Sequence, residues 1–197
     1  LQTFETNIRG TYNLLEACRI NSVSRTVVAS SDKAYGKQSQ LPYTEDMSLS
    51  GLQPYEVSKS CTDMLAQSYY HSYELPVAVA RCGNVYGGGD LNWSRIVPGT
   101  IKSLLKKERP EIRSDGEYVR DYIYVKDVVL AYMRLAEFVE NDNVTGQAFN
   151  FGNEIPITVK ALVRRIQEVM DCEYIEPEIL STAQGEIPSQ YLSSDLA

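Results

Sequence analysis

Histidine is almost absent from this chain of 197 residues, because His71 is the only one. Cysteine is also scarce, and its four positions show no paired spacing. A zinc site with histidine and thiolate ligands is therefore not expected, and neither is a disulfide framework. The sequence predicts no metal site and four reduced thiols of the kind found in cytoplasmic proteins, at Cys18, Cys61, Cys82 and Cys172.

The chain also has no excess of positive charge and no long hydrophobic run. Its 26 acidic residues outnumber 19 basic ones, which gives a net charge of −7. This balance argues against nucleic acid or an anionic membrane surface as a partner. No apolar run approaches the length of a membrane span. We therefore expect a cytoplasmic protein with a small-molecule ligand, and an anionic ligand would need a local basic pocket.

A glycine-rich turn of the kind that binds a dinucleotide is missing as well. Such a turn follows a first strand and opens a helix. Gly87, Gly88 and Gly89 follow a late strand and lack the required spacing. The sequence starts at Leu1, inside an apparent helix, rather than at a methionine. We expect the chain to be a fragment of a longer protein.

Helical and strand patterns alternate along the sequence. Apolar residues at helical spacing between Phe4 and Cys18 predict a first helix. Alternation of strands and helices indicates βαβ units and a parallel sheet, hence an α/β fold. The predicted strands are 25–30, 77–82, 111–113, 119–123 and 148–151, and the later predicted helices are 55–73, 94–107, 126–140 and 158–170.

Polar clusters follow two of the predicted strands. One is Ser30 to Lys33, and the other is the glycine-rich turn from Gly83 to Asp90. In parallel sheets, ligands bind beyond the carboxyl ends of the strands. Both clusters should therefore face one crevice.

Tyr55 and Lys59 lie four residues apart on a predicted helix and so share one face. A phenol has an ordinary pKa of about 10, which is too high for a general base at neutral pH. A nearby ammonium and a cationic cofactor ring would both lower it. Ser31 would then hydrogen-bond the same substrate oxygen. The alternative for the pair is an ordinary half-exposed helix face.

Taken in order along the chain, these segments resemble the extended short-chain dehydrogenase/reductase family, the NAD-dependent nucleotide-sugar epimerases and dehydratases. The resemblance is carried by five segments, namely Asn7 to Ala17, Ser30 to Gly36, Tyr55 to Lys59, Arg81 to Gly87, and Val119 to Asp127.

The resemblance implies the C-terminal part of a doubly wound, Rossmann-like sheet with a smaller mixed α/β substrate-binding region. An incomplete NAD-binding domain would comprise residues 1–83 and 119–151, and the substrate-binding region would comprise 84–118 and 152–197. About 80–100 residues carrying the glycine-rich turn would be missing, at roughly 30 residues for each βαβ unit. The chain by itself should then bind NAD weakly or not at all. Helices 5–20 and 55–73 would form a homodimer interface.

The resemblance also assigns roles to residues. The catalytic set is Ser31, Asp32, Lys33, Tyr55 and Lys59; the cofactor contacts are Ser30, Tyr55, Lys59 and Cys82; and the substrate contacts are Asn84, Arg95, Ile96 and Arg120. The two arginines are the candidates for binding a diphosphate, because guanidinium groups match phosphate oxygens.

The pair Asp32-Lys33 favours a 4,6-dehydratase over an epimerase within this family. The common dTDP-glucose branch has Asp-Glu there, whereas Asp-Lys resembles both CDP-glucose and UDP-N-acetylglucosamine 4,6-dehydratases. The segment from Gly87 to Asp90, with Arg95 to Pro98 after it, is more similar to the CDP-glucose branch. Dehydration would need a neutral Lys33 to remove a proton from C5 and a protonated Asp32 to release the 6-hydroxyl as water. Two alternatives stay open: an epimerase or reductase of the same family, and a non-catalytic module completed by another chain.

Overall fold

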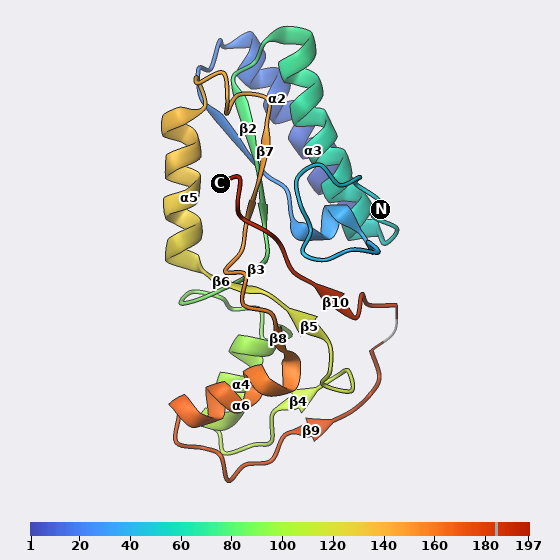
Figure 1. Cartoon of the computed structure of the whole chain (residues 1–197), viewed down its shortest axis with the longest axis vertical. Helices are drawn as coiled ribbons and strands as arrows, with labels where there is room; N and C mark the ends of the chain where they lie inside the picture. Colours follow the sequence, from blue (N-terminus) through green and yellow to red (C-terminus); the bar gives the residue numbers. More distant parts are fainter. Residues whose placement is uncertain (184) are drawn as a thin grey trace.

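A three-stranded parallel sheet forms the centre of the computed structural model, which describes residues 1–183 and 185–197. The strands are β1 (Thr26–Ala29), β2 (Val77–Cys82) and β7 (Ala148–Phe151), in the order β1-β2-β7 (Figure 1). In the register of this sheet, Val28 pairs with Val79 and Ala80 pairs with Phe149. The expected α/β fold with a parallel sheet is confirmed.

Helices cover both faces of this sheet. Helix α3 (Pro54–Tyr73) and the N-terminal helical stretch pack on one face, and α5 (Val125–Phe138) packs on the other (Figure 1). The N-terminal stretch is continuous through α1 (Gln2–Phe4), a π-helical segment η1 (Glu5–Arg9) and α2 (Gly10–Ile20). Of its predicted apolar stripe, Leu15 is fully buried, whereas Tyr12 remains 39% exposed.

Strand β2 is buried along its whole length because it lies between these two layers. Val77 and Val79 pack with Leu15 and Ala66 on the α2 and α3 side. Ala78, Ala80 and Cys82 pack with Leu135 and Phe149 on the α5 side. A central strand with helices on both faces requires a nearly continuous apolar sequence, and 77–82 is apolar except for the buried Arg81.

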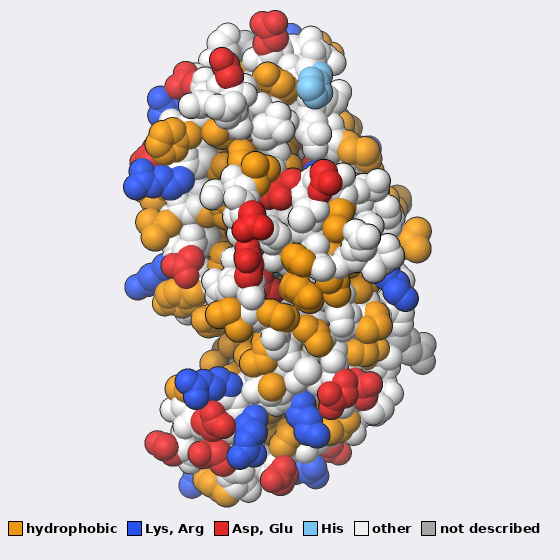
Figure 2. All heavy atoms as spheres, viewed as in Figure 1, with side chains coloured by type: hydrophobic (Ala, Val, Ile, Leu, Met, Phe, Trp, Pro, Cys, Tyr) orange, Lys and Arg blue, Asp and Glu red, His pale blue; other side chains and the backbone are white. Residues whose placement is uncertain are grey.

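Shorter elements form the lower part of the molecule in Figure 1. Helices α4 (Ile96–Leu105) and α6 (Val159–Val169) pack on each other. The small strands around them are β3 (Asn84–Tyr86) with β6 (Tyr122–Tyr124), β10 (Ser189–Gln190) with β5 (Val119–Arg120) and β8 (Ile157–Thr158), and β4 (Glu111–Ile112) with β9 (Glu178–Ile179). Figure 2 shows an indentation at the left between the two parts, and hydrophobic side chains forming a band across the middle.

Two sequence-based expectations need correction. The segment 83–90 was predicted to be a turn, yet it contains β3, which pairs with β6. The predicted strand 119–123 is interrupted at Asp121, and its halves belong to different sheets. The reason is that the buried Asp121 carboxylate accepts hydrogen bonds from the backbone N–H groups of Asn153 and Glu154, each at 3.2 Å. The predicted helices are present, with ends that shift by one or two residues.

Within the described residues, no helix combines the length and the apolar character needed to cross a membrane. Those residues also contain no group of three His, Cys, Asp or Glu side chains arranged to hold a metal ion.

Candidate active site

The segment that leaves β1 forms a tight polar turn. Ser31 has extended backbone angles and caps the single 3-10 turn η2 (Asp32–Tyr35), where its Oγ accepts the Lys33 N–H at 3.2 Å. The same hydroxyl donates to Asp32 Oδ1 at 3.0 Å. Asp32 is 3% exposed, and Lys33 Nζ lies 3.6 Å from Asp32 Oδ2. An acidic and a basic side chain are thus adjacent at the carboxyl end of the strand.

Helix α3 places Tyr55 and Lys59 beside this turn. Pro54 at its first position and reciprocal capping by Gln53 and Glu56 define where the helix begins. Tyr55 therefore lies in the first turn, and Lys59 lies one turn further, with its Nζ donating to the Ala29 carbonyl at 2.7 Å. Lys59 Nζ is 6.0 Å from the centre of the Tyr55 ring. The hydrogen bond from Lys59 to Ala29 holds the end of β1 and the start of α3 together.

A cavity of about 440 Å³ brings nine of the eleven predicted site residues together. These are Ser30, Ser31, Asp32, Lys33, Tyr55, Cys82, Asn84, Arg95 and Ile96. A second cavity of about 410 Å³ shares Asn84, Arg95 and Ile96 with the first and is also lined by Arg120. The two cavities are therefore contiguous, and the polar groups at the ends of β1 and β2 do face one crevice.

Electrostatics at the site depart from the expectation for Tyr55. Partial burial raises the pKa of Tyr55, and the hydroxyl of Ser31 opposes this effect. Burial lowers the pKa of Lys59. The protein's own side chains thus do not make Tyr55 a base near neutral pH. A further positive charge beside the phenol would be needed, since it would favour the phenolate.

The side chains predicted to contact the substrate differ in their exposure and in how many protein partners they already bind. Arg95 precedes α4 and forms an exposed ion pair with Asp90 at 3.1 Å. Arg120 is 8% exposed and donates to the carbonyls of Val119 and Pro188 and, at 3.4 Å, to Glu186. Ile96 is the first residue of α4, so the positive end of this helix faces both cavities.

Two of the residues predicted to contact ligands, Ser30 and Asn84, also form hydrogen bonds to backbone carbonyls. Ser30 Oγ donates to the Lys59 carbonyl at 3.4 Å, which ties β1 to α3. Asn84 Nδ2 donates to the Asp121 carbonyl at 3.1 Å, and Asn84 lines both cavities.

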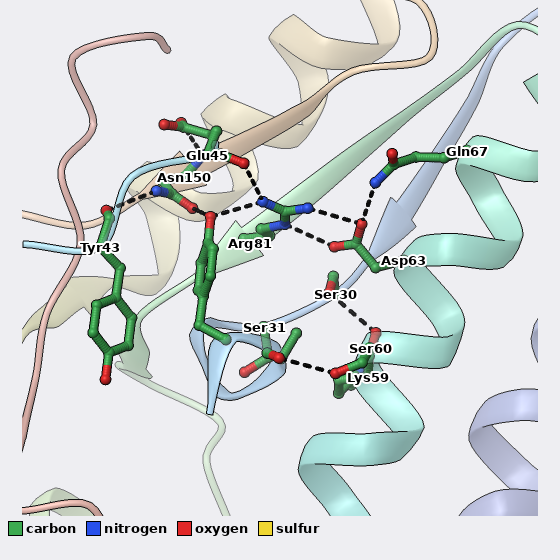
Figure 3. A network of polar contacts seen from close by, with 12 residues as sticks. Ser30, Ser31, Tyr43, Glu45, Lys59, Ser60, Asp63, Gln67, Arg81 and Asn150 are labelled. Atoms are coloured by element: carbon green, nitrogen blue, oxygen red, sulfur yellow. Dashed lines mark hydrogen bonds and ion pairs between the residues drawn. The ribbon is translucent and has the colours of Figure 1, made fainter. Parts of the chain in front are cut away.

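A buried polar network behind the site was not anticipated from the sequence. Arg81 on β2 points toward Asp63 on α3, and its Nη1 also donates to the Tyr35 hydroxyl at 2.7 Å (Figure 3). The Tyr35 hydroxyl in turn donates to Asn150 on β7 at 2.8 Å. Burial raises the pKa of Tyr35 to about 12. The network connects β2, β7 and the turn η2 to the helix that carries Tyr55 and Lys59.

Gln190 is a second feature that sequence reasoning missed. It is fully buried on β10, and its side chain contacts both Lys33 and Asp32. A separation of 157 residues leaves no local pattern that could have revealed this contact.

Comparisons with known proteins agree with this arrangement. A dTDP-glucose 4,6-dehydratase of Streptomyces griseus is 31% identical over 180 residues, which are 91% of this chain and 53% of that protein. The solved dTDP-glucose 4,6-dehydratase of Bacillus anthracis, in complex with NAD, superimposes with a TM-score of 0.85 at 27% identity, over 98% of this chain and 60% of that one. A Thermotoga maritima UDP-glucose 4-epimerase with UDP-glucose gives 0.85 at 29% identity, over 98% and 62%.

The chain spans about half the length of the first of these relatives and about 60% of the solved structures. Both solved neighbours are nucleotide-sugar enzymes, and their match over nearly the whole chain confirms the expected Rossmann-like fold. Residues 1–152 match the model of one protein family, which covers the parallel sheet and the polar turn with its neighbouring helix. The chain belongs to the NAD dependent epimerase/dehydratase family.

Proposed function

We propose that this chain carries the catalytic and substrate-binding part of an NAD-dependent nucleotide-sugar 4,6-dehydratase. The observation that carries the proposal is the juxtaposition of Asp32 and Lys33 beside Tyr55 in one cavity, with 3.6 Å between Lys33 Nζ and Asp32 Oδ2. An epimerase needs the tyrosine alone for proton transfer at C4. Elimination of water needs an acid and a base in addition, and this pair supplies both.

The residues present fit NAD at the nicotinamide end. Lys59 uses one of its three N–H donors on Ala29, so two are left for ribose hydroxyls. Tyr55 lacks a positive charge that would favour its phenolate, and a nicotinamidium ring beside it would provide one. When bound, NAD would accept hydride from C4 of the sugar and return it at C6. Ser30 and Cys82 at the strand ends would flank this region.

The protein's side chains would divide the proton transfers among themselves. Tyr55 would take the proton from the 4-hydroxyl while Ser31 holds the same oxygen. The resulting 4-ketone acidifies the hydrogen on C5, which Lys33 would remove. Asp32 would donate a proton to the 6-hydroxyl, which leaves as water. The close spacing of Asp32 and Lys33 allows removal of the C5 proton and loss of the hydroxyl to occur at neighbouring atoms.

The substrate would extend from this cavity into the second one. Arg95, Arg120 and the N-terminus of α4 would bind the diphosphate, because all three present positive charge or free N–H donors. Asn84, where the two cavities meet, would contact the sugar or a phosphate. CDP-glucose is the substrate that we favour, on the resemblance of Asp32-Lys33 and the segment from Gly87 to Asp90.

Domain organisation, assembly and location belong to the same proposal. Residues 1–83 and 119–151 would serve the cofactor, and residues 84–118 and 152–197 the substrate. A homodimer would form through α2 and α3, which leave Leu14 60% and Met64 54% exposed. The free cysteines of the described residues support a cytoplasmic location.

The test uses the polypeptide encoded by the complete reading frame that contains this sequence. It is incubated with NAD and with CDP-glucose, dTDP-glucose or UDP-glucose in separate reactions. Loss of one water with formation of a 4-keto sugar supports the proposal, and the preferred nucleotide shows whether CDP is correct. A 4-epimer without loss of water would indicate an epimerase, and no product with any of the three would favour a non-catalytic module.

The variant Lys33→Met tests the role of Lys33 separately, because it leaves Tyr55 and Lys59 intact. It is expected to abolish water loss while NAD reduction by the sugar continues. If Lys33→Met dehydrates at the normal rate, then the assigned base is wrong.

A further inference from the structure

The amide of Gln190 has only one possible orientation between its two neighbours. Its Nε2 donates to the Asp32 carbonyl at 2.8 Å, and a carbonyl can only accept. The other end of the amide, Oε1, therefore faces Lys33 and accepts a hydrogen bond from its Nζ. Gln190 thus holds the Lys33 amino group through a neutral acceptor.

The backbone around Gln190 is fixed on both sides, so the amide has little freedom to move. Strand β10 pairs in parallel with β5, where Gln190 is in register with Arg120, and the segment carrying β10 runs beside β5 in Figure 1. The next residue, Tyr191, accepts the Tyr43 N–H at 2.9 Å, and Tyr43 accepts the Ser193 N–H at 2.9 Å. Tyr43 is itself fully buried. The amide is therefore held firmly behind Asp32 and Lys33, which line the cavity.

The neutral amide oxygen of Gln190 gives Lys33 a hydrogen-bond acceptor other than the Asp32 carboxylate. Lys33 Nζ and Asp32 Oδ2 are 3.6 Å apart, a distance at which the two groups do not share a good hydrogen bond. The two groups already attract each other at this distance. If nothing else held Lys33, its ammonium would also hydrogen-bond the carboxylate, which would favour the charged forms of both groups further. An amide oxygen binds one N–H of either the amine or the ammonium and leaves the amine lone pair free.

We propose that Gln190 is a positioning residue that keeps Lys33 apart from Asp32, so that one can act as base and the other as acid. This inference rests on the proposed dehydratase function for its chemical meaning, whereas the physical claim concerns only the protonation of Lys33. The other charged or titratable groups that line the cavity with Lys33 are Tyr55 from α3, Cys82 from β2, Tyr86 from β3, Asp90 and Arg95 before α4, Tyr122 from β6 and Tyr132 from α5, and Arg120 on β5 is in register with Gln190.

The test measures the protonation of Lys33 without any substrate. Each lysine of the complete protein is acetylated with a trace of acetic anhydride at a series of pH values, and the extent at each site is read by mass spectrometry. Because only the neutral amine reacts, the curve gives a midpoint for Lys33, with Lys37 and Lys59 as internal controls. Gln190→Met, which has a similar shape and no amide, is expected to raise the Lys33 midpoint by about one pH unit, because the ammonium would then hydrogen-bond the Asp32 carboxylate.

A second substitution distinguishes a changed interaction between Lys33 and Asp32 from a general increase in the accessibility of Lys33. Adding Asp32→Asn to Gln190→Met should return the midpoint to its original value, because the carboxylate is gone. Loosening would instead speed acetylation at every pH without moving the midpoint. An unchanged midpoint in a folded Gln190→Met protein, or a shift that persists with Asp32→Asn, would overturn the proposal.

An alternative variant and a kinetic measurement supplement the acetylation experiment. If Gln190→Met does not fold, Gln190→Leu also removes the amide, so it should raise the midpoint in the same way, and adding Asp32→Asn should again cancel the rise. In turnover with a nucleotide sugar, Gln190→Met should lower kcat about tenfold, the fraction lost with one pH unit, while KM stays constant. Absence of turnover in the unaltered protein counts against the dehydratase function, whereas the acetylation midpoints still decide the role of Gln190.

Discussion

The Arg81 guanidinium and the Asp63 carboxylate form a two-pronged ion pair in the interior of the protein, with Nε to Oδ2 at 2.8 Å and Nη2 to Oδ1 at 3.0 Å. The two side chains are 4% and 0% exposed. The pair joins the central strand β2 to α3, four residues beyond Lys59. It raises the pKa of Arg81, which therefore stays charged at any accessible pH.

Arg81→Met is expected to lower the free energy of unfolding by about 3–5 kcal/mol, because Asp63 would be left buried without its partner. Chemical denaturation of the variant and the unaltered protein measures the difference. Arg25→Ala is the matched control, since Arg25 and Glu140 form an exposed pair that should contribute no more than about 1 kcal/mol. Adding Asp63→Leu to Arg81→Met should recover most of the loss. Equal effects of the buried and exposed substitutions would contradict this view of the network.

If the proposed function is correct, Tyr55→Phe is expected to reduce formation of the 4-keto sugar by about 10²–10⁴-fold, because it removes the group proposed to take the 4-hydroxyl proton. Binding of the nucleotide sugar, measured by calorimetry, should change little. Tyr73→Phe, at the exposed end of the same helix, should keep full activity. Retention of more than about a tenth of the activity in Tyr55→Phe would remove Tyr55 from this role.

The stability of the protein should fall at alkaline pH through Cys82. Burial raises the pKa of the Cys82 thiol to about 11. In the unfolded chain the thiol ionises near pH 8.5, so this contribution is complete below that pH and is lost as the pH rises to about 11. The slope should approach about 1.4 kcal/mol per pH unit. The difference in unfolding free energy between the unaltered protein and Cys82→Ser, measured from pH 8 to 11, isolates this effect, and a constant difference would refute it.

Gly36, which ends the polar turn, should not tolerate a side chain. Its φ is +61° with ψ of −154°, and an added Cβ would lie 2.3 Å from the Ser50 carbonyl oxygen. Gly36→Ala is expected to cost more than about 1 kcal/mol of stability. Gly10→Ala is the counterpart, because Gly10 lies in a helix with open space around it and should gain about 0.5–1 kcal/mol. Thermal melts of both variants test this pair, and similar effects in the two would count against it.

Sequence patterns predicted the parallel sheet and its long helices because these depend on periodic apolar residues. The apolar run 77–80 and the spacing of Tyr55 and Lys59 are local signals of this kind. The grouping of Ser31 to Lys33 with Tyr55, Cys82 and Asn84 also followed from the rule that strand ends converge.

What could not be predicted depends on contacts between distant segments. Strands β8, β9 and β10 contain two residues each, too few for any periodicity to appear. The break at Asp121 depends on backbone donors 32 and 33 residues away. Arg81 inside a predicted strand gave no hint of its partner, because the Asp63 carboxylate reaches it only after α3 has packed on the sheet.

The distance in sequence between Lys33 and Gln190 also sets an order of events during synthesis. The polar turn can dock on α3 once residue 73 has left the ribosome, whereas Gln190, whose amide contacts this turn, is synthesised 117 residues later. At typical elongation rates this interval is roughly 6–25 seconds. During that time the lysine and the aspartate are free to hydrogen-bond each other. On the proposed role of Gln190, a nascent chain would therefore hold the polar turn with Lys33 hydrogen-bonded to Asp32, and Lys33 would move to the amide only when β10 takes its place beside β5.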